Sequence, residues 1–456
     1  MENKSVAFLS LGCKVNSYET DSIEKQFKDA GYIIKSFDET ADVYVINTCS
    51  VTNMADRKSR QMISKARKKN PSAVIVATGC YVQTCDEEKI KSELKIDIAI
   101  GNNKKSNVLE AVKRYVSEGE RQFDIININD KCGYEDTPIE DTLENTRAYI
   151  KIQDGCNQFC SYCIIPYARG RIRSRGIASV LSEVKKLALK GYKEVVVTGI
   201  HLSSYGLDFV EETYEMKDYS PFKYEYLLEV LKKINEIQGI ERIRLGSLEP
   251  RIITSDFLSG LKQVTKLCPH FHLSLQSGCD ETLKRMNRKY DGRKYIESLK
   301  LLREFYVNPA ITTDVIVGFP MESEEEFAVT ENFLKECQFS MMHIFKYSRR
   351  KRTVADKMTG QIPEEVKTER SKKLLTLNEE MNKSYCELFV GKEAEVLFEE
   401  KTTFNGEAYY SGHTDNYIKV MLPTQLVNCQ NLENQIIKVT LLEYIGENTM
   451  LAKMCN

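Results

Sequence analysis

The chain has 456 residues, a length that predicts two or three domains, and its 65 basic and 66 acidic residues nearly balance. This composition is that of an ordinary soluble protein and excludes a chain that binds nucleic acid through an overall positive charge, so RNA contact requires local basic patches. The polar N-terminus and the lack of any apolar stretch of ~20 residues predict a cytoplasmic protein with no membrane partner.

The first 118 residues alternate short apolar runs with helical patterns. We expect strands at residues 6–11, 43–46, 74–77 and 96–100, and helices at residues 19–30, 55–69, 86–94 and 108–117. Such alternation predicts an α/β fold whose N-terminal domain, residues 1–118, is a doubly wound parallel sheet.

Three cysteines of this domain lie just past the ends of its first three predicted strands, at Cys13, Cys49 and Cys80. The carboxyl ends of parallel strands meet at one sheet edge, where open α/β folds bind ligands. The alternative is three separately buried thiols, but their convergence in a reducing cytosol favours a [4Fe–4S] cluster that is held by three thiolates and keeps one iron open. We expect Cys85, in a predicted helix, to take no part.

Acidic residues mark the end of the first domain. Residues 130–144 contain six acids and one lysine, together with Gly133 and Pro138. This composition predicts a solvated linker at residues 119–141, with the next domain beginning at residue 142.

A second group of cysteines forms a Cys-x3-Cys-x2-Cys run at Cys156, Cys160 and Cys163, directly after a predicted strand at residues 148–153. Three thiolates on one loop can hold three irons of a [4Fe–4S] cluster and leave the fourth iron open. The alternatives are free thiols or a zinc site, but zinc prefers four ligands in separate pairs. The spacing resembles that of radical S-adenosylmethionine (SAM) enzymes, in which the open iron binds SAM and the reduced cluster cleaves it to a 5′-deoxyadenosyl radical.

Strand and helix patterns then recur five more times within residues 142–372, with strands expected at residues 193–198, 242–246, 270–275, 310–317 and 340–345. Six such units predict a (βα)6 partial barrel whose active face lies at the carboxyl ends of the strands. Polar and glycine residues at those ends are candidates for SAM binding, although ordinary turn chemistry is the alternative. The candidates are Thr198, Gly199, Ser274, Gln276, Asp314 and Gly318.

A helix is expected at residues 364–387, and the C-terminal part, residues 375–456, begins within it. This part is expected to continue as a small antiparallel β-barrel, with strands at residues 394–398, 408–411, 417–422 and 436–444. From Cys386 onward it has five lysines, no arginine and ten acids, so it is a poor phosphate binder. RNA contact there would depend on Tyr409, Tyr410 and Tyr417, which could equally pack the barrel.

Three basic clusters elsewhere could contact phosphates, or could simply be solvated faces. They are residues 57–69, the arginines Arg169, Arg171, Arg173 and Arg175 beside the cysteine loop, and residues 349–352. The placement of the second cluster favours contact with substrate or cofactor.

Several sequence runs together resemble the methylthiotransferase family of radical SAM enzymes over nearly the whole chain. They are residues 11–16, 47–49, 78–80, 156–171 and 274–278, and the tail resembles the RNA-contacting TRAM domain of that family. Residues 198–206 are most similar to the branch that acts on threonylcarbamoyladenosine in tRNA. Two positions depart from the family pattern, with Met321 and Arg352 standing where glycine is common.

The resemblance implies a function. A methylthio group would be placed on C2 of N6-threonylcarbamoyladenosine next to the tRNA anticodon, with two [4Fe–4S] clusters and SAM as cofactors. The cluster at Cys13, Cys49 and Cys80 would supply the sulfur, one SAM would methylate it, and a second SAM would yield the radical. The implied partners are tRNA, a reductant of the flavodoxin or ferredoxin type, and an unidentified sulfur source.

Two alternative functions are compatible with the same residues. The same chemistry could act on isopentenyl-adenosine tRNA or on a ribosomal-protein aspartate. A protein of another class, a non-catalytic iron–sulfur carrier or RNA-binding protein, would bind a cluster without cleaving SAM, although labile three-cysteine clusters suit catalysis better than storage.

Overall fold

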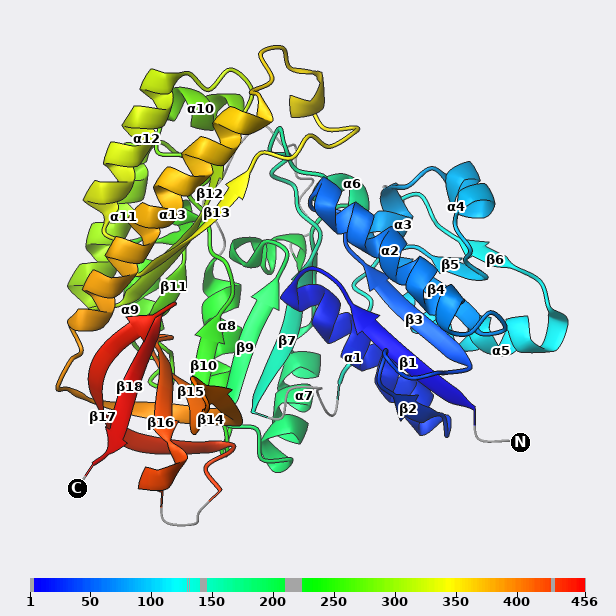
Figure 1. Ribbon diagram of the computed structural model, residues 1–456, viewed down its shortest axis with the longest axis horizontal. Coiled ribbons are helices and arrows are strands. Elements are labelled where there is room, and N and C mark those ends of the chain that lie inside the picture. Colours follow the sequence, from blue (N-terminus) through cyan, green and yellow to red (C-terminus); the bar gives the residue numbers. More distant parts are fainter. Residues whose placement is uncertain are drawn as a thin grey trace.

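The computed structural model describes residues 4–128, 130, 132–139, 146–209, 224–427 and 431–455. It contains an N-terminal sheet, a central half-barrel and a C-terminal β-barrel (Figure 1). Within the described ranges, no helix combines the length and apolar character needed to cross a lipid bilayer.

The N-terminal unit is a six-stranded sheet in which every pairing is parallel. Its strand order is β2-β1-β3-β4-β5-β6. The strands are β1 (Ser5–Ser10), β2 (Ile33–Lys35), β3 (Val43–Thr48), β4 (Val74–Gly79), β5 (Ile98–Ile100) and β6 (Gln122–Asp124), and the helices are α1 (Lys14–Asp29), α2 (Asn53–Lys69), α3 (Cys80–Thr84), α4 (Glu87–Glu93) and α5 (Val108–Glu118).

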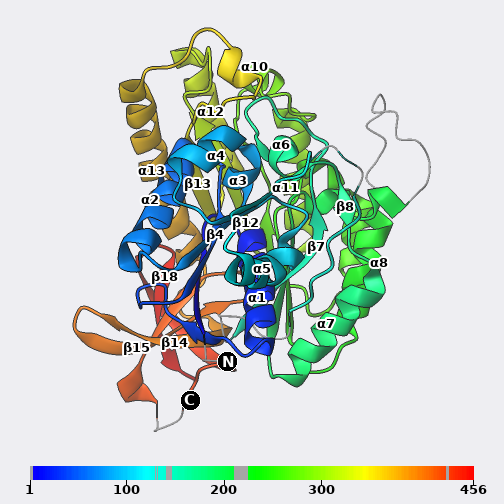
Figure 2. The same ribbon diagram turned by 90° about the vertical axis from the view of Figure 1, so that its right-hand side faces the viewer.

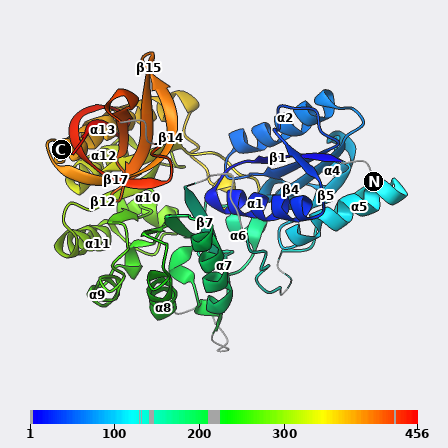
Figure 3. The same ribbon diagram turned by 90° about the horizontal axis from the view of Figure 1, so that it is seen from below.

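Helices cover both faces of this sheet, which confirms the doubly wound prediction. Alternate strand residues point to opposite faces, so Val43 and Val45 pack with the α1 residue Phe27, whereas Tyr44 and Ile46 belong to a second core that contains Ile63 of α2. Figure 3 shows α1 and α2 on opposite sides of the sheet.

The central unit contains six parallel strands, as predicted, with helices on its outer side (Figure 2). The order β7-β9-β10 continues through isolated bridges at Leu267 and Leu273 into β11-β12-β13, and the short β8 runs antiparallel to β7. The strands are β7 (Arg147–Asp154), β8 (Arg173–Ser174), β9 (Glu194–Gly199), β10 (Arg242–Leu245), β11 (His270–His272), β12 (Ala310–Val317) and β13 (Met341–Lys346).

The helices of this unit enclose the largest hydrophobic core of the described chain. They are α6 (Ile165–Arg169), α7 (Ile177–Leu189), α8 (Tyr224–Asn235), α9 (Ser255–Leu261), α10 (Asp280–Arg285), α11 (Gly292–Phe305), α12 (Glu324–Cys337) and α13 (Glu364–Glu387). The predicted helix at residues 364–387 is confirmed, and its Leu374 and Leu377 pack into this core.

The C-terminal unit is a closed barrel of order β14-β15-β16-β18-β17. Its strands are β14 (Glu393–Phe404), β15 (Glu407–Thr414), β16 (Lys419–Pro423), β17 (Gln435–Gly446) and β18 (Thr449–Met454). The prediction of a purely antiparallel barrel is wrong in one pairing, because β16 and β18 run parallel where the barrel closes.

The β-barrel docks at the amino ends of the half-barrel strands. Arg242 donates to the carbonyl oxygens of Glu395 and His413, at 2.8 and 3.0 Å, and Tyr417 stacks on His270 with ring centroids 4.9 Å apart. Tyr409 and Tyr410 are buried. Of the two roles considered for these three tyrosines, the structure therefore supports packing rather than RNA contact.

Other predicted details need correction. Strands β2, β6 and β18 were not expected, since each is short or follows a turn without a long apolar run. Strand β6 lies in the expected linker, and Ile128 and Ile139 are buried, so parts of this segment pack on the protein rather than being solvated throughout. Cys85 caps α3 in an extended conformation and is not helical. Met321 and Arg352, which replace family glycines, have positive φ of 66° and 75°.

Candidate active site

The Cys156–Cys163 loop begins at the carboxyl end of β7 and leads into α6. Gly155 makes the turn with φ of 70°, and a Cβ on it would lie 1.8 Å from the carbonyl oxygen of Arg171, so only glycine fits. The loop is closed by hydrogen bonds from Cys156 N to Gly170 O (3.0 Å) and from Cys163 N to Cys160 O (2.9 Å). These contacts hold three thiols on one short segment.

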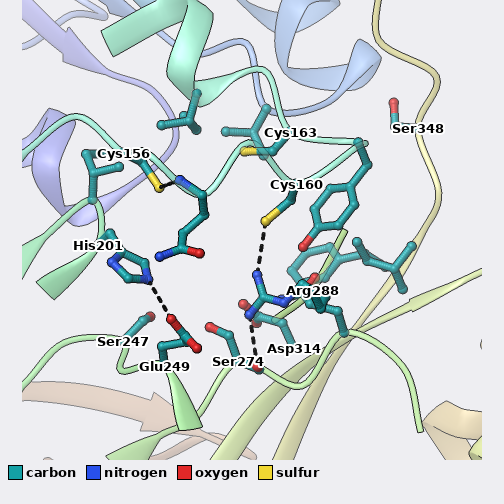
Figure 4. Close-up of a pocket in the computed structure, with 18 of the residues that line it drawn as sticks. Cys156, Cys160, Cys163, His201, Ser247, Glu249, Ser274, Arg288, Asp314 and Ser348 are labelled. Atoms are coloured by element: carbon teal, nitrogen blue, oxygen red, sulfur yellow. Dashed lines mark hydrogen bonds and ion pairs between the residues drawn. The ribbon is translucent and has the colours of Figure 1, made fainter. Parts of the chain in front are cut away.

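The loop opens on a cavity of about 370 Å³ at the carboxyl ends of the half-barrel strands. Figure 4 shows the three thiols on one side and polar residues from the strand ends on the other. The walls include Cys156, Gln158, Cys160, Cys163, His201, Ser247, Glu249, Ser274, Gln276, Arg288, Asp314, Lys346 and Ser348. A cavity of this size can hold a nucleoside-sized ligand.

The donor set around the loop fits an iron–sulfur cluster. The loop supplies three thiol sulfurs, and Arg288 Nη1 lies 3.2 Å from Cys160 Sγ, which would stabilise a negatively charged cluster. Burial raises the pKa of Cys156, and it raises the pKa of Cys163 to about 12. Metal binding would therefore have to displace protons from these thiols.

Two polar groups opposite the thiols are held in place by their neighbours. His201 Nε2 lies 3.5 Å from Glu249 Oε2, and Arg251 also donates to that carboxylate. Burial alone would raise the pKa of Glu249, but the hydrogen bonds from Arg251 and His201 lower it to about 2. Glu249 is thus an anionic acceptor that can receive the amino group or hydroxyls of a ligand.

The three cysteines of the N-terminal sheet also converge. Cys13 precedes α1, Cys49 follows β3, and Cys80 begins α3 directly after β4. A Cβ on Gly12 would lie 2.5 Å from Cys49 Sγ, so that sulfur packs on the backbone next to Cys13. Burial is the main cause that raises the pKa of Cys49 to about 11, and the nearby thiols of Cys80 and Cys13 add to it. Burial likewise raises the pKa of Cys13, with a smaller contribution from Cys80.

This N-terminal trio faces the Cys156–Cys163 loop across the boundary between the two units. Cys80 contributes to the raised pKa of Cys163, so the two thiols lie within electrostatic range. Asn102 joins α3 to α6, because its Nδ2 donates to Ala168 O at 2.7 Å and lies 3.7 Å from Cys80 Sγ. The N-terminal trio is therefore connected through Asn102 to the helix that follows the Cys156–Cys163 loop.

A buried cluster of charges locks this arrangement. It consists of Glu19, Lys105, Lys151, Asp154 and Arg169. Arg169 is fully buried and joins Glu19 of α1 (2.8 Å) to Asp154 at the end of β7 (3.1 Å). Despite burial, the positive charges of Arg169 and the two lysines hold the pKa of Glu19 well below its ordinary value. Glu19 therefore stays ionised although it is buried.

We expect Arg169→Met to destabilise the protein by about 3 kcal/mol, because it leaves two buried carboxylates without their shared guanidinium. Urea unfolding followed by circular dichroism measures the change. Arg171→Met, which alters the exposed neighbouring arginine, is the matched control. Equal unfolding midpoints for the two variants would show that the buried cluster does not hold the units together.

The expected contact of the Arg169–Arg175 group with substrate or cofactor is wrong for most of its members. Arg169, Arg173 and Arg175 are buried in ion pairs with acids of the protein, and only Arg171 is exposed. Within residues 349–352, Arg350 is buried against Asp56 at 2.8 Å. Exposed basic residues remain on α2, where Arg57, Arg60, Lys65 and Lys68 line a surface depression.

The residues predicted to bind SAM divide into two groups. Ser274, Gln276 and Asp314 line the cavity. Thr198, Gly199 and Gly318 lie at strand ends but outside its lining: Gly199 packs on Gln153, and Gly318 N donates to Glu322 Oε2 at 2.7 Å. The residues of the second group lie behind the cavity wall and contact other protein residues there.

Several lining residues were missed at the sequence level. His201 and Glu249 follow β9 and β10 by a few residues, so the strand-end rule that selected Ser274 could have found them. Arg288 lies beyond α10, and no sequence signal places it beside Cys160. Only the fold of that loop brings the guanidinium to the sulfur.

Comparisons with known proteins agree with this geometry. Residues 5–101 match the model of a family described as "Uncharacterized protein family UPF0004", and residues 150–334 match "Radical SAM superfamily". A Bacillus subtilis (strain 168) protein named threonylcarbamoyladenosine tRNA methylthiotransferase MtaB is 42% identical over 441 residues, which cover 96% of this chain and 94% of that one.

Other similar proteins include a second tRNA-modifying type and a distant structure. A Clostridium botulinum protein named tRNA-2-methylthio-N(6)-dimethylallyladenosine synthase is 36% identical over 413 residues, covering 88% of this chain and 87% of its own. The solved radical SAM methyltransferase TsrM from Kitasatospora setae, with cobalamin and a [4Fe–4S] cluster bound, has a TM-score of 0.55 at 14% identity over 78% of this chain and 74% of that one. The last likeness concerns the fold alone.

Proposed function

Because the chain belongs to the radical SAM tRNA methylthiotransferase family, we propose that it places a methylthio group on C2 of N6-threonylcarbamoyladenosine in tRNA. The observation that carries this proposal is the pair of cysteine trios facing one another across the boundary between sheet and half-barrel. Two sets of three thiols on either side of one boundary suit a reaction in which one site generates a radical and the other provides sulfur.

In this proposal Cys156, Cys160 and Cys163 hold one [4Fe–4S] cluster, and Cys13, Cys49 and Cys80 hold a second. When bound, the clusters and SAM supply a carbon radical and the sulfur to be transferred. Arg288 supports the negative charge at Cys160. Ser274, Gln276 and Asp314 contact SAM, and Glu249 receives its amino group or hydroxyls. Thr198, Gly199 and Gly318 support the wall from behind.

The boundary between the units would receive the nucleobase. Val51 and Thr52 of the N-terminal unit line the same cavity as Cys160. Asn53 N donates to Ser348 Oγ at 3.0 Å, so the two units also meet at its rim. Enclosure by both units would exclude water from a reactive carbon radical.

The proposed partners are tRNA, a reductant of the flavodoxin or ferredoxin type, and a sulfur source. The proposed site of action is the cytoplasm. The basic depression on α2 begins one turn after the residues at the cavity rim. Its exposed cations are suited to the phosphates that flank a nucleotide held in the cavity.

Nucleoside mass spectrometry of tRNA from cells with and without this protein tests the proposal. We expect loss of the 2-methylthio-threonylcarbamoyl species alone, with the unmethylthiolated nucleoside accumulating. Loss of the 2-methylthio-dimethylallyl species instead would favour the second candidate, which the 36% identical relative supports. An unchanged nucleoside profile would contradict both.

The carrier hypothesis is tested in vitro. We expect anaerobically reconstituted protein to form 5′-deoxyadenosine from SAM and dithionite. Well-loaded protein that binds iron and sulfide but forms none would favour a carrier.

A further inference from the structure

A group of polar side chains lies next to the cavity on the inner side of β11, β12 and β13. Donor atoms of His272, Asp314 and His343 all lie within 4.8 Å of one another, and His272 Nε2 is 3.3 Å from Asp314 Oδ2. Thr312 Oγ1, 2.9 Å from His272 Nδ1, orients that ring. Asp314 is also part of the cavity wall, so this group is continuous with the proposed active site.

A lysine reaches the same place from the N-terminal unit. Lys14 directly follows Cys13, and its ammonium lies 5.7 Å from the ring centroid of Tyr149 on β7. Its charge adds to the effect of burial in lowering the pKa of His343, which places it near that ring. The Glu194 carboxylate is within electrostatic range of Lys14, but its ion pair is with Arg244, at 2.7 Å. We call Lys14, His272, Asp314 and His343 the polar corner.

Lys14 and Cys13 are exposed to solvent, but within a recess. Lys14 has a large accessible area, yet its ammonium lies over the ring of Tyr149, 5.7 Å from the centroid. A side chain in such a recess retains stronger electrostatic interactions than one on an open surface. An anion entering the recess would thus meet the Lys14 ammonium next to one of the proposed cluster thiols, with the guanidinium groups of Arg147 and Arg244 and the Glu194 carboxylate also within electrostatic range.

The chemistry of adenine relates this corner to the reacting carbon. C2 is separated from C6 by a single ring nitrogen, so the substituent on N6 must lie near any group that reacts at C2. A threonylcarbamoyl group carries a carboxylate, a hydroxyl and N–H donors, whereas a dimethylallyl group is wholly apolar. Covering charged side chains with an apolar group would remove their hydration without replacing it.

We propose that the polar corner is the subsite for the N6 substituent, and that Lys14 and His343 bind the threonyl carboxylate while Asp314, which also borders the proposed SAM site, positions His272. The inference rests on the proposed function and specifies its substrate. It makes the corner the part of the site that selects a polar, anionic substituent over an apolar one.

Binding of anticodon stem–loop RNAs to the full, cluster-loaded chain tests this subsite, with fluorescence anisotropy as the readout. The RNAs carry threonylcarbamoyladenosine, its methyl ester, dimethylallyladenosine or unmodified adenosine. We expect Lys14→Met to weaken binding of the carboxylate RNA roughly tenfold, to the level of the ester, with the other RNAs unaffected. Lys14→Arg should retain most of the discrimination, and Lys453→Met on the distant β18 is the matched control.

A second variant guards against damage to the neighbouring Cys13. His343→Gln lies on β13, far from all six cysteines in sequence, and should also weaken only the carboxylate RNA. Equal affinity of the unaltered protein for the acid and its ester would overturn the inference, as would preference for the dimethylallyl RNA. So would a bound zinc or iron ion lost in His343→Gln, which would make the corner a metal site.

The outcome is separable from that of the proposed function. Carboxylate-dependent binding is measured without turnover. Failure of the proposed function would appear as unmodified C2 in threonylcarbamoyladenosine RNA after incubation of the loaded protein with SAM and reductant, whatever the binding data.

Discussion

Replacing Cys160 with alanine is expected to abolish the formation of 5′-deoxyadenosine from SAM. Cys160 is one of the three thiols of the loop and the one that Arg288 contacts, so its loss removes a proposed iron ligand and the sulfur partner of that guanidinium. We expect the rate to fall more than ~100-fold, because loss of even an outer partner of a metal ligand typically costs 10–100-fold. Anaerobic reconstitution followed by chromatography of nucleosides and an iron assay measures both effects.

Cys268→Ala provides the matched control for this thiol. Cys268 is equally small and is buried near Arg244 at the amino end of the half-barrel, away from the cavity. Its replacement should leave SAM cleavage within a factor of a few of the unaltered protein. Full cleavage by Cys160→Ala would remove Cys160 from the ligand set.

Replacing Cys49 is expected to separate the two proposed clusters. Cys49→Ala should lose about four irons per chain and stop methylthio transfer, yet still form 5′-deoxyadenosine, because the Cys156–Cys163 loop is intact. Measured together, iron content, nucleoside products and 5′-deoxyadenosine distinguish this result from general misfolding. A misfolded protein would lose all three.

Cys85→Ala is the control for this second experiment. Cys85 belongs to the same unit and lies beside Tyr81, but it is no part of the N-terminal trio. We expect its iron content and both activities to match the unaltered protein. If Cys49→Ala kept its full iron, Cys49 would not be a ligand; if Cys85→Ala lost about four irons, Cys85 would be one.

The docking of the β-barrel illustrates what sequence patterns cannot provide. The tail was recognised as a barrel because its strands alternate polar and apolar residues between turns. The use of Tyr417, however, depends on a partner: it stacks on His270 and lies under Arg244 of another unit. From sequence alone, such a tyrosine could contact RNA or pack against another unit. Only the position of the neighbouring unit distinguishes the two.

The arginines beside the cysteine loop give a second example. Their spacing next to a catalytic loop suggested phosphate or cofactor binding. In the fold Arg169 instead joins Glu19 and Asp154, which are separated from it by 150 and 15 residues. The acid that neutralises such an arginine lies on another element, so its burial could not be derived from local sequence.

Local sequence by itself determined most of the strands and helices and the Cys156–Cys163 loop, since both depend on residues close in the chain: apolar periodicity, glycine at Gly155 and the spacing of Cys156, Cys160 and Cys163. It also placed Cys13, Cys49 and Cys80 just past the ends of three predicted strands. The tertiary structure alone decided that the two trios share one boundary, that Arg288 reaches Cys160, and that Lys14 joins His272, Asp314 and His343. These pairings join residues up to ~330 positions apart, and such contacts form only when separate units pack and bury their charges together.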